Sequence, residues 1–220
     1  MTETTAGVAD AAADREAIKD IVEAWVVRRD SAQWNELLSL FHADGVMSAT
    51  WKQSSAAEFV AGSKANWERG IYAQHFLGGT AVNFGADPDR AIAQTKMTIS
   101  QRAPVHGTVV DVVASGRFYD FFARRDGRWG IVLRQPIYER DRWDPVVSGE
   151  VVAVDTAKLA SFPDGFRHLA YLQTESGMTV KTDMPGRTGP VLEALYARGV
   201  AWLAGAKGHP VDAGFGEKAA

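Results

Sequence analysis

A histidine and an aspartate far apart in the chain are the residues whose chemistry is easiest to recognise. His75 lies between apolar neighbours in residues 72 to 79 (YAQHFLGG), where the β-rich half of the chain begins. Asp30 ends residues 25 to 30 (WVVRRD), the last part of a predicted amphipathic helix. An imidazole can remove a proton near neutral pH, and a carboxylate bonded to its second nitrogen fixes the tautomer and stabilises the cation. The pair is therefore predicted to act as a catalytic base with its orienting group.

A structural interpretation of the same two residues is the alternative. His75 would then be a hydrogen-bonded histidine in the wall of the fold, and Asp30 would only end a helix. The two interpretations differ in one geometric requirement, because catalysis needs the helix end and the strand to pack together beside a cavity.

The composition is that of an ordinary globular protein. The chain has 220 residues, 46 % hydrophobic and 23 % charged, with a formal net charge of −3. It has no Lys/Arg-rich cluster, which argues against nucleic acid, and no apolar run of the roughly 18 residues that a membrane helix requires. Without a signal-like N-terminus, we expect a cytoplasmic protein. The chain has no cysteine, so disulfides, thiolate nucleophiles and thiolate-held metals are excluded.

The N-terminal part of the chain has helical periodicity. Residues 1 to 13 are expected to form a flexible tail. From Asp14, apolar residues repeat at spacings of three and four up to Asp30, which predicts one buried helical face. A second short helix is expected from Ser31 to Phe41, followed by a turn at residues 42 to 45 and a strand from Val46 to Trp51. Ser54 or Ser55 can begin a third helix, which Gly70 ends.

The pattern then becomes extended. Strands are predicted over residues 74 to 84, with a bulge at Gly78-Gly79, and over 90 to 102. Residues 108 to 124 and 128 to 139 should form a long hairpin, because Asp126-Gly127 is a strong two-residue turn signal. This order of elements predicts an α+β domain over residues 14 to 143, with three N-terminal helices on one face of a cone-shaped, curved antiparallel sheet.

The C-terminal segment, residues 144 to 220, has helical stretches around 156 to 160, 166 to 173 and 191 to 203. It carries many apolar residues that need cover, among them Phe162, Phe166, Tyr171 and Trp202. We expect this helical extension to pack on the domain or on a neighbouring subunit.

Five short segments together resemble the SnoaL-like branch of the nuclear transport factor 2-like superfamily. They are residues 30 to 34 (DSAQW), 40 to 45 (LFHADG), 74 to 78 (QHFLG), 116 to 120 (GRFYD) and 126 to 129 (DGRW). The resemblance covers about residues 14 to 140. It implies an α+β barrel with an apolar pocket, usually in homodimers or homotrimers, and its members include scytalone dehydratases, lindane dehydrochlorinases, ketosteroid isomerases, formaldehyde lyases of lignin-derived diaryl compounds and non-catalytic binding modules. Fold alone therefore does not give the function.

The resemblance also implies roles for single residues. In the dehydratase and dehydrochlorinase relatives, an aspartate at the end of the first helix orients a histidine on a strand, and Asp30 and His75 occupy these places. The dehydrochlorinases also have a basic residue in the first helix and an arginine on the last strand. Here Trp25 stands at the first place, and counting from Trp129 puts Leu133 at the second, with Arg134 on the opposite face. We therefore do not expect this chain to catalyse dehalogenation.

Further residues are predicted to bind substrate. Arg117 and Tyr119 share one strand face, opposite Asp120, and either could stabilise an oxyanion if that face lines the cone; a structural ion pair of Arg117 is the alternative. Tyr138 could donate a hydrogen bond. The remaining substrate-binding candidates, Trp25, Trp51 and Phe76, belong to an aromatic set that suits a small hydrophobic or aromatic ligand.

The five histidines are scattered and no phosphate-binding motif is present, so neither a metal nor another cofactor is expected. The sequence thus favours a cofactor-independent lyase that removes water or formaldehyde from a small, aromatic, phenylpropanoid-type molecule. The alternatives are an isomerase of the ketosteroid type and a non-catalytic module that binds a small molecule or a partner.

Overall fold

The computed structural model describes residues 3–211, with side chains from residue 11 onward. Six strands form a single sheet in the order β2-β1-β6-β5-β4-β3. The elements are α1 (Glu3–Asp30), α2 (Trp34–Leu38), β1 (Phe41–Ser48), β2 (Gln53–Ser55), α3 (Ala56–Glu68), β3 (Ala73–Phe84), β4 (Arg90–Val105), β5 (Thr108–Arg125), β6 (Arg128–Pro145), α4 (Thr156–Ala160), α5 (Arg167–Glu175) and α6 (Pro190–Leu203).

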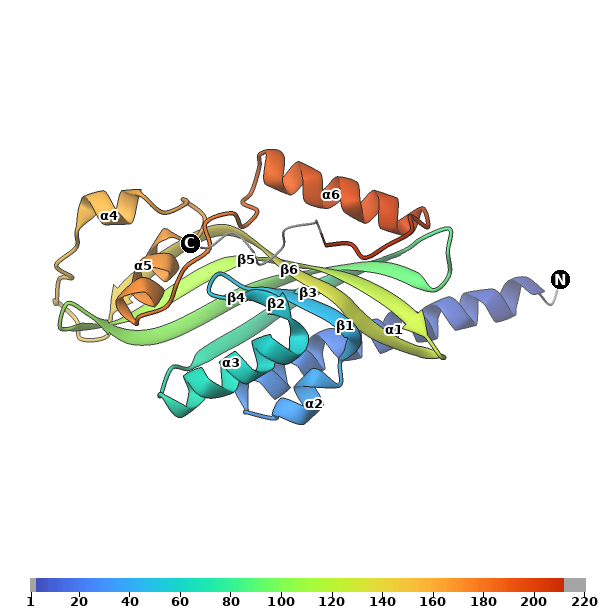
Figure 1. Ribbon diagram of the computed structural model, residues 1–220, viewed down its shortest axis with the longest axis horizontal. Helices are drawn as coiled ribbons and strands as arrows, with labels where there is room; N and C mark the ends of the chain where they lie inside the picture. Colours follow the sequence, from blue (N-terminus) through green and yellow to red (C-terminus); the bar gives the residue numbers. More distant parts are fainter. Residues whose placement is uncertain (1–2, 212–220) are drawn as a thin grey trace.

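The predicted α+β class, with three N-terminal helices on one face of a curved sheet, is confirmed (Figure 1). The sheet is curved but does not close, because β2 and β3 are its two edges. One pairing differs from the expected antiparallel sheet, since β1 lies parallel to β6. The local sequence does not encode this pairing. The direction in which β1 enters the sheet depends on how the preceding helices α1 and α2 pack.

The sheet has a helix-covered core on each side. α1, α2 and α3 cover the concave face and α6 lies across the opposite, convex face (Figure 1). Alternate residues of β5 serve the two cores: Phe118 and Phe122 join the core on the concave side, while Tyr119 and Phe121 join the core under α6. Side chains in adjacent positions of one strand therefore lie in different environments.

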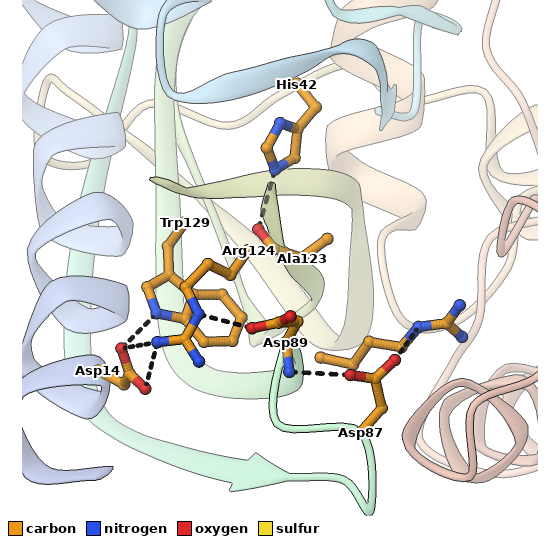
Figure 2. A network of polar contacts seen from close by, with 8 residues as sticks. Asp14, His42, Asp87, Asp89, Ala123, Arg124 and Trp129 are labelled. Atoms are coloured by element: carbon orange, nitrogen blue, oxygen red, sulfur yellow. Dashed lines mark hydrogen bonds and ion pairs between the residues drawn. The ribbon is translucent and has the colours of Figure 1, made fainter. Parts of the chain in front are cut away.

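Polar contacts hold α1 to one end of the sheet (Figure 2). The guanidinium of Arg124 donates to both carboxylate oxygens of Asp14 at 2.9 and 3.0 Å, and to Asp89 in the turn between β3 and β4 at 2.7 Å. The indole nitrogen of Trp129 donates to the same Asp14 at 2.8 Å. Asp14 therefore lies within α1 and anchors it, rather than starting it.

Several local signals act as predicted. The hydroxyl of Ser55 accepts the amide N–H of Glu58, whose carboxylate accepts the amide N–H of Ser55, and this reciprocal cap begins α3. Asp126 and Gly127 both have positive φ, 52° and 77°, in the hairpin turn. The pairing of β3 with β4 shifts register between Leu77 and Thr80, which contains the predicted bulge.

Other boundaries differ from the predictions. α1 already begins at Glu3, so a tail is not seen over the described part of residues 1 to 13; alanines at 11 to 13 are strong helix formers. α2 is restricted to Trp34–Leu38. The predicted turn at residues 42 to 45 lies inside β1, where it appears as a shift in the register between β1 and β6.

The C-terminal segment lies along two parts of the sheet. The backbone N–H of Lys181 donates to the carbonyl of Thr50, and that of Tyr138 donates to the carbonyl of Pro185. In α6, the indole nitrogen of Trp202 donates to the carbonyl of Phe122 at 3.2 Å. Residues 212 to 220 of the expected extension lie outside the described residues. Of the helices that the structure describes, none is long and apolar enough to cross a membrane.

Gly199 allows α6 to lie close to the sheet. A Cβ atom at this position would collide with the hydroxyl of Tyr119 and with its ring. Gly→Ala inside a helix normally stabilises by about 1 kcal/mol. We predict the opposite for Gly199→Ala, a loss of about 1–3 kcal/mol from overpacking, measured as the free energy of unfolding in urea. The exposed Val200→Ala on the same helix is the control and should change it little; a stabilised Gly199→Ala would contradict this packing.

Candidate active site

The end of α1 and the start of β3 meet through two hydrogen bonds between Asp30 and His75. The ring nitrogen Nδ1 of His75 lies 2.7 Å from Oδ1 of Asp30, and the backbone N–H of His75 donates to Oδ2 at 2.6 Å. A carboxylate can only accept, so Nδ1 carries the proton. The other ring nitrogen, Nε2, then has its lone pair free to accept a proton.

The imidazole is enclosed by aromatic rings. Trp25 meets it edge-on with ring centroids 5.3 Å apart, and Phe118 lies at 6.2 Å. The His75 side chain is only 6 % exposed. Burial lowers the pKa of His75, and the hydrogen bond and charge of Asp30 oppose that effect without overcoming it. The neutral, proton-accepting form is therefore favoured.

His75 forms part of the wall of a small cavity between the concave face and the helices. The cavity of about 40 Å³ lies among residues of α1, α3, the strands and α5. Its walls are mainly apolar and aromatic. The residues that line it are Trp25, Arg29, Met47, Ala49, Thr50, Trp51, Phe59, Ala73, His75, Ile99, Gln101, Phe118, Pro136, Tyr138, Leu169 and Gln173.

A chain of polar side chains joins α5 to β4 and to the connection between β1 and β2. The hydroxyl of Thr50 donates to Oε1 of Gln173 at 2.7 Å, and Nε2 of Gln173 donates to Oε1 of Gln101 at 3.0 Å. Tyr138 is 2 % exposed. Burial raises the pKa of its phenol, an effect that a hydrogen bond with Thr50 partly offsets. The phenol thus keeps its proton and can act as a hydrogen-bond donor.

Two further groups of this wall have hydrogen-bond donors without acceptors. Nε1 of Trp25 and Nη1 of Arg29 are buried, and neither has a partner among the described residues. The two residues are four apart on α1, so they lie on the same helical face. Desolvation by burial lowers the pKa of Arg29, and the charge of Asp30 opposes this.

A buried ion pair supports the rings behind the cavity. Arg134 donates through Nε and Nη2 to the two carboxylate oxygens of Asp120, at 2.8 and 2.7 Å, and both side chains are fully buried. The guanidinium carbon lies 4.5 Å from the ring centroid of Trp25 and 4.3 Å from that of Phe118. Arg134 therefore lies on the concave face, and the prediction that placed it on the opposite face was wrong.

A bulge explains that error. Phe121 pairs with Leu133 and Phe122 with Ile131, so Val132 is an extra residue in β6. The strict alternation counted from Trp129 is shifted by one position beyond this point, and Leu133 faces α6 instead.

Among the predicted substrate-binding residues, Trp25, Trp51 and Tyr138 line the cavity. Arg117 and Tyr119 do not. Arg117 donates to Glu139 at 2.8 Å and to the hydroxyl of Tyr196 in α6 at 2.6 Å, which is the structural ion pair considered as the alternative. Tyr119 packs under α6, where burial raises its pKa to about 12.

Phe76 is also outside the cavity wall, and it is 65 % exposed. It follows His75 on β3, and adjacent side chains of a strand point to opposite faces. Since the imidazole faces inward, the Phe76 ring faces outward.

Sequence reasoning missed Arg29, Thr50, Gln101 and Gln173. Arg29 has a local signal, because it lies four residues after Trp25 on the apolar side of the helix. Thr50 lies between β1 and β2, Gln101 lies in β4 and Gln173 in α5, and no spacing in the sequence relates the three. For metals, the described residues include no group of three or more His, Cys, Asp or Glu side chains placed to hold an ion.

The sequence model of the SnoaL-like domain family matches residues 10–135, more than half of the chain. The chain belongs to the SnoaL-like family. A relative in Fusarium vanettenii, pea pathogenicity protein 2, is 34 % identical over 203 residues, covering 88 % of this chain and 87 % of its own. An uncharacterized protein of Emericella nidulans is 34 % identical over 206 residues, covering 87 % of both chains.

Solved structures show the same fold at low identity. A hexachlorocyclohexane dehydrochlorinase (LinA type 2) superposes with a TM-score of 0.51 at 15 % identity, covering 67 % of this chain and 97 % of its own. A Mycobacterium tuberculosis protein of unknown function gives 0.51 at 18 % identity, over 80 % of this chain and 96 % of its own. These similarities establish the fold alone. The chemistry has to be inferred from the residues of the site.

The protonation of His75 can be measured without a substrate. We predict that its imidazole titrates below the ordinary pKa of about 6.5, as followed by NMR of the ring nuclei. Asp30→Asn should lower the pKa further, because the opposing negative charge is lost and only a neutral amide oxygen can accept the hydrogen bond from Nδ1. The unfolded chain binds the proton more readily, so the contribution of His75 to stability is present above the ordinary pKa and is lost as the pH falls towards the folded pKa. Titration at or above the ordinary value would contradict the desolvated site.

The buried Asp120–Arg134 pair should be strongly coupled. Arg134→Met leaves a carboxylate buried without its partner, which typically costs about 3–5 kcal/mol. The double variant Asp120→Leu/Arg134→Met removes both charges and should recover much of that loss. Urea unfolding of both variants measures the coupling, with Arg102→Met, which breaks the exposed pair with Asp111, as a control of little effect. Equal losses in the single and double variants would disprove the coupling.

Proposed function

We propose that this protein is a cofactor-independent lyase that removes water or formaldehyde from a small, hydrophobic, aromatic molecule. One observation carries the proposal: an imidazole held by a carboxylate forms part of the wall of an apolar cavity. Such cavities suit aromatic ligands, and a neutral imidazole within one suits proton abstraction. The hexachlorocyclohexane dehydrochlorinase with this fold is named for an elimination, which agrees with the proposed reaction class.

His75 is the proposed base. For loss of water, Nε2 takes the proton from a substrate carbon, the electron pair of that C–H bond forms the new double bond, and hydroxide leaves from the adjacent carbon. For loss of formaldehyde, Nε2 takes the proton of a hydroxymethyl group, and the C–C bond breaks to leave its electron pair on the substrate. In both cases Asp30 stabilises the imidazolium. The imidazolium then gives its proton to the departing hydroxide, forming water, or to the substrate carbon that kept the electron pair when formaldehyde left.

Tyr138 is the proposed donor. It lines the same cavity, is buried, and keeps its phenolic proton because burial raises its pKa. A donor in a site of low polarity stabilises negative charge on a leaving hydroxyl or on an enolate-like oxygen more strongly than it would in water. Trp25, Trp51 and Phe118 would then bind the ring of the substrate.

The site geometry disfavours the two alternatives. A ketosteroid-type isomerase needs a carboxylate as the proton shuttle, and among the described residues that line the cavity there is no Asp or Glu. Both oxygens of the nearby Asp30 are bonded to His75. A non-catalytic module does not need an oriented imidazole in the cavity wall. Chloride release is not proposed. Arg134 is already paired with Asp120, and Trp25 stands where the dehydrochlorinases have a basic residue in the first helix.

Removal of the imidazole tests the proposal. A panel of aromatic compounds with hydroxyl or hydroxymethyl groups is incubated with the full chain, and mass spectrometry detects products lighter by water or formaldehyde. On a converted compound, His75→Ala should lower turnover by about 10² to 10⁴, while circular dichroism shows a folded protein. Gln74→Ala, on the exposed side of the same strand, is the control. Unchanged turnover in His75→Ala would exclude His75 as the base.

The expected homodimer or homotrimer stays a prediction. β3 is an edge strand, and Phe76 and Tyr72 expose apolar surface along it, which supports association through this edge. Light scattering after size-exclusion chromatography measures the molecular mass in solution.

A further inference from the structure

Arg29 is a buried cation in the cavity wall that the proposed reaction does not use. It is 5 % exposed and lines the cavity together with His75. Among the described residues its Nη1 has no acceptor, although that atom is buried. A guanidinium has five N–H donors and no acceptor, so it needs oxygen atoms to replace the water it loses on burial.

The described neighbours of Arg29 supply no acceptor for Nη1. The nearest acid in sequence, Asp30, contributes charge but uses both carboxylate oxygens to bind His75. The ring of Trp34 lies 5.8 Å from the guanidinium carbon and offers only a weak contact. The Nη1 atom of the buried Arg134 also has no acceptor among the described residues, but its charge is paired, because Asp120 accepts two hydrogen bonds from Nε and Nη2. Arg29 is thus the buried arginine of this wall without a bonded carboxylate.

We propose that Arg29 binds a carboxylate of the substrate, so that the substrate is a hydrophobic, aromatic carboxylic acid. Carboxylate and guanidinium match as planar partners, and their hydrogen bonds are stronger than those between neutral groups. The nearby Nε1 of Trp25, also without an acceptor, is a second donor on the same helical face. This inference rests on the proposed function, because it specifies the substrate class of the same site.

The position of Arg29 also orients the substrate. Arg29 precedes Asp30, whose carboxylate holds His75, so a carboxylate bound to Arg29 lies at the α1 side of the cavity. The rest of the substrate would then contact His75, Tyr138 and Thr50, which line the same cavity.

The cavity must widen to admit a ring. Its volume of about 40 Å³ is below the ~150 Å³ that holds benzene in an engineered cavity. Part of the wall, Leu169 and Gln173, belongs to α5, and Gln173 bonds to Thr50 and Gln101.

Benzoate and benzamide test the proposal, because they have nearly the same shape and differ in charge. Isothermal titration calorimetry of the full chain should show that benzoate binds about 10- to 100-fold more tightly than benzamide, as expected for charge-assisted hydrogen bonds. Arg29→Gln should abolish this preference, and Arg29→Lys should keep part of it. Arg28→Gln removes the same charge from a side chain that bonds the carbonyl of Glu36, and should leave the preference unchanged.

A second measurement needs no variant. An anion next to the imidazole favours its charged form, so benzoate should raise the pKa of His75 in the NMR titration and benzamide should not. If Arg29→Gln does not fold, this comparison in the unmodified chain decides the question.

The outcomes separate the two proposals. Equal affinity for the two ligands, failure of benzoate to bind, or an unchanged preference in Arg29→Gln would overturn the carboxylate site. None of these would remove the lyase, which is tested by the turnover of His75→Ala. Conversely, a carboxylate preference that persists in His75→Ala without any turnover in the unmodified chain would leave a binding site for aromatic acids and remove the lyase.

Discussion

The hydrogen bonds between Asp30 and His75 join the last residue of α1 to the edge strand β3, and the concave side of the molecule depends on them. Removing a carboxylate from water is costly unless its oxygens are bonded. The carboxylate of Asp30 is partly buried, and His75 bonds to both of its oxygens with one backbone and one side-chain donor. The same contact therefore stabilises the helix against the sheet and gives the imidazole a defined tautomer. The docking of α1 on β3 and the orientation of the imidazole thus result from the same pair of hydrogen bonds.

The two faces of the sheet have different roles because side chains alternate along each strand. On β5, Phe118 and Asp120 face the cavity side, whereas Arg117 and Tyr119 are covered by α6. The convex face has a polar cluster of its own, in which Arg117 bonds to Glu139 and to Tyr196 of α6. Charged and aromatic residues of similar type in one strand are thus divided between a structural contact and the candidate site.

Buried charge is treated unequally on the concave side. Arg134 is neutralised by Asp120 and stacks on Trp25 and Phe118, so it rigidifies the aromatic wall from behind. Arg29, one helical turn from Trp25, has no such carboxylate among the residues that the structure describes. Burying an unpaired cation costs free energy. For Arg29 this cost falls at a position where the carboxylate of a ligand can form the ion pair.

The sequence by itself determined the helical and extended segments, the cap at Ser55, the hairpin turn and the pairing of His75 with Asp30, because periodicity, turn residues and family motifs are local or positional signals. Only the tertiary structure decided the parallel pairing of β1, the inward direction of Arg134 and the outward direction of Arg117 and Tyr119. One extra residue, Val132, reverses the alternation in β6, and which face of β5 is concave depends on the packing of α1. It also decided that Arg29, Thr50, Gln101 and Gln173 share one wall, because contacts between distant segments leave no periodic trace in the chain.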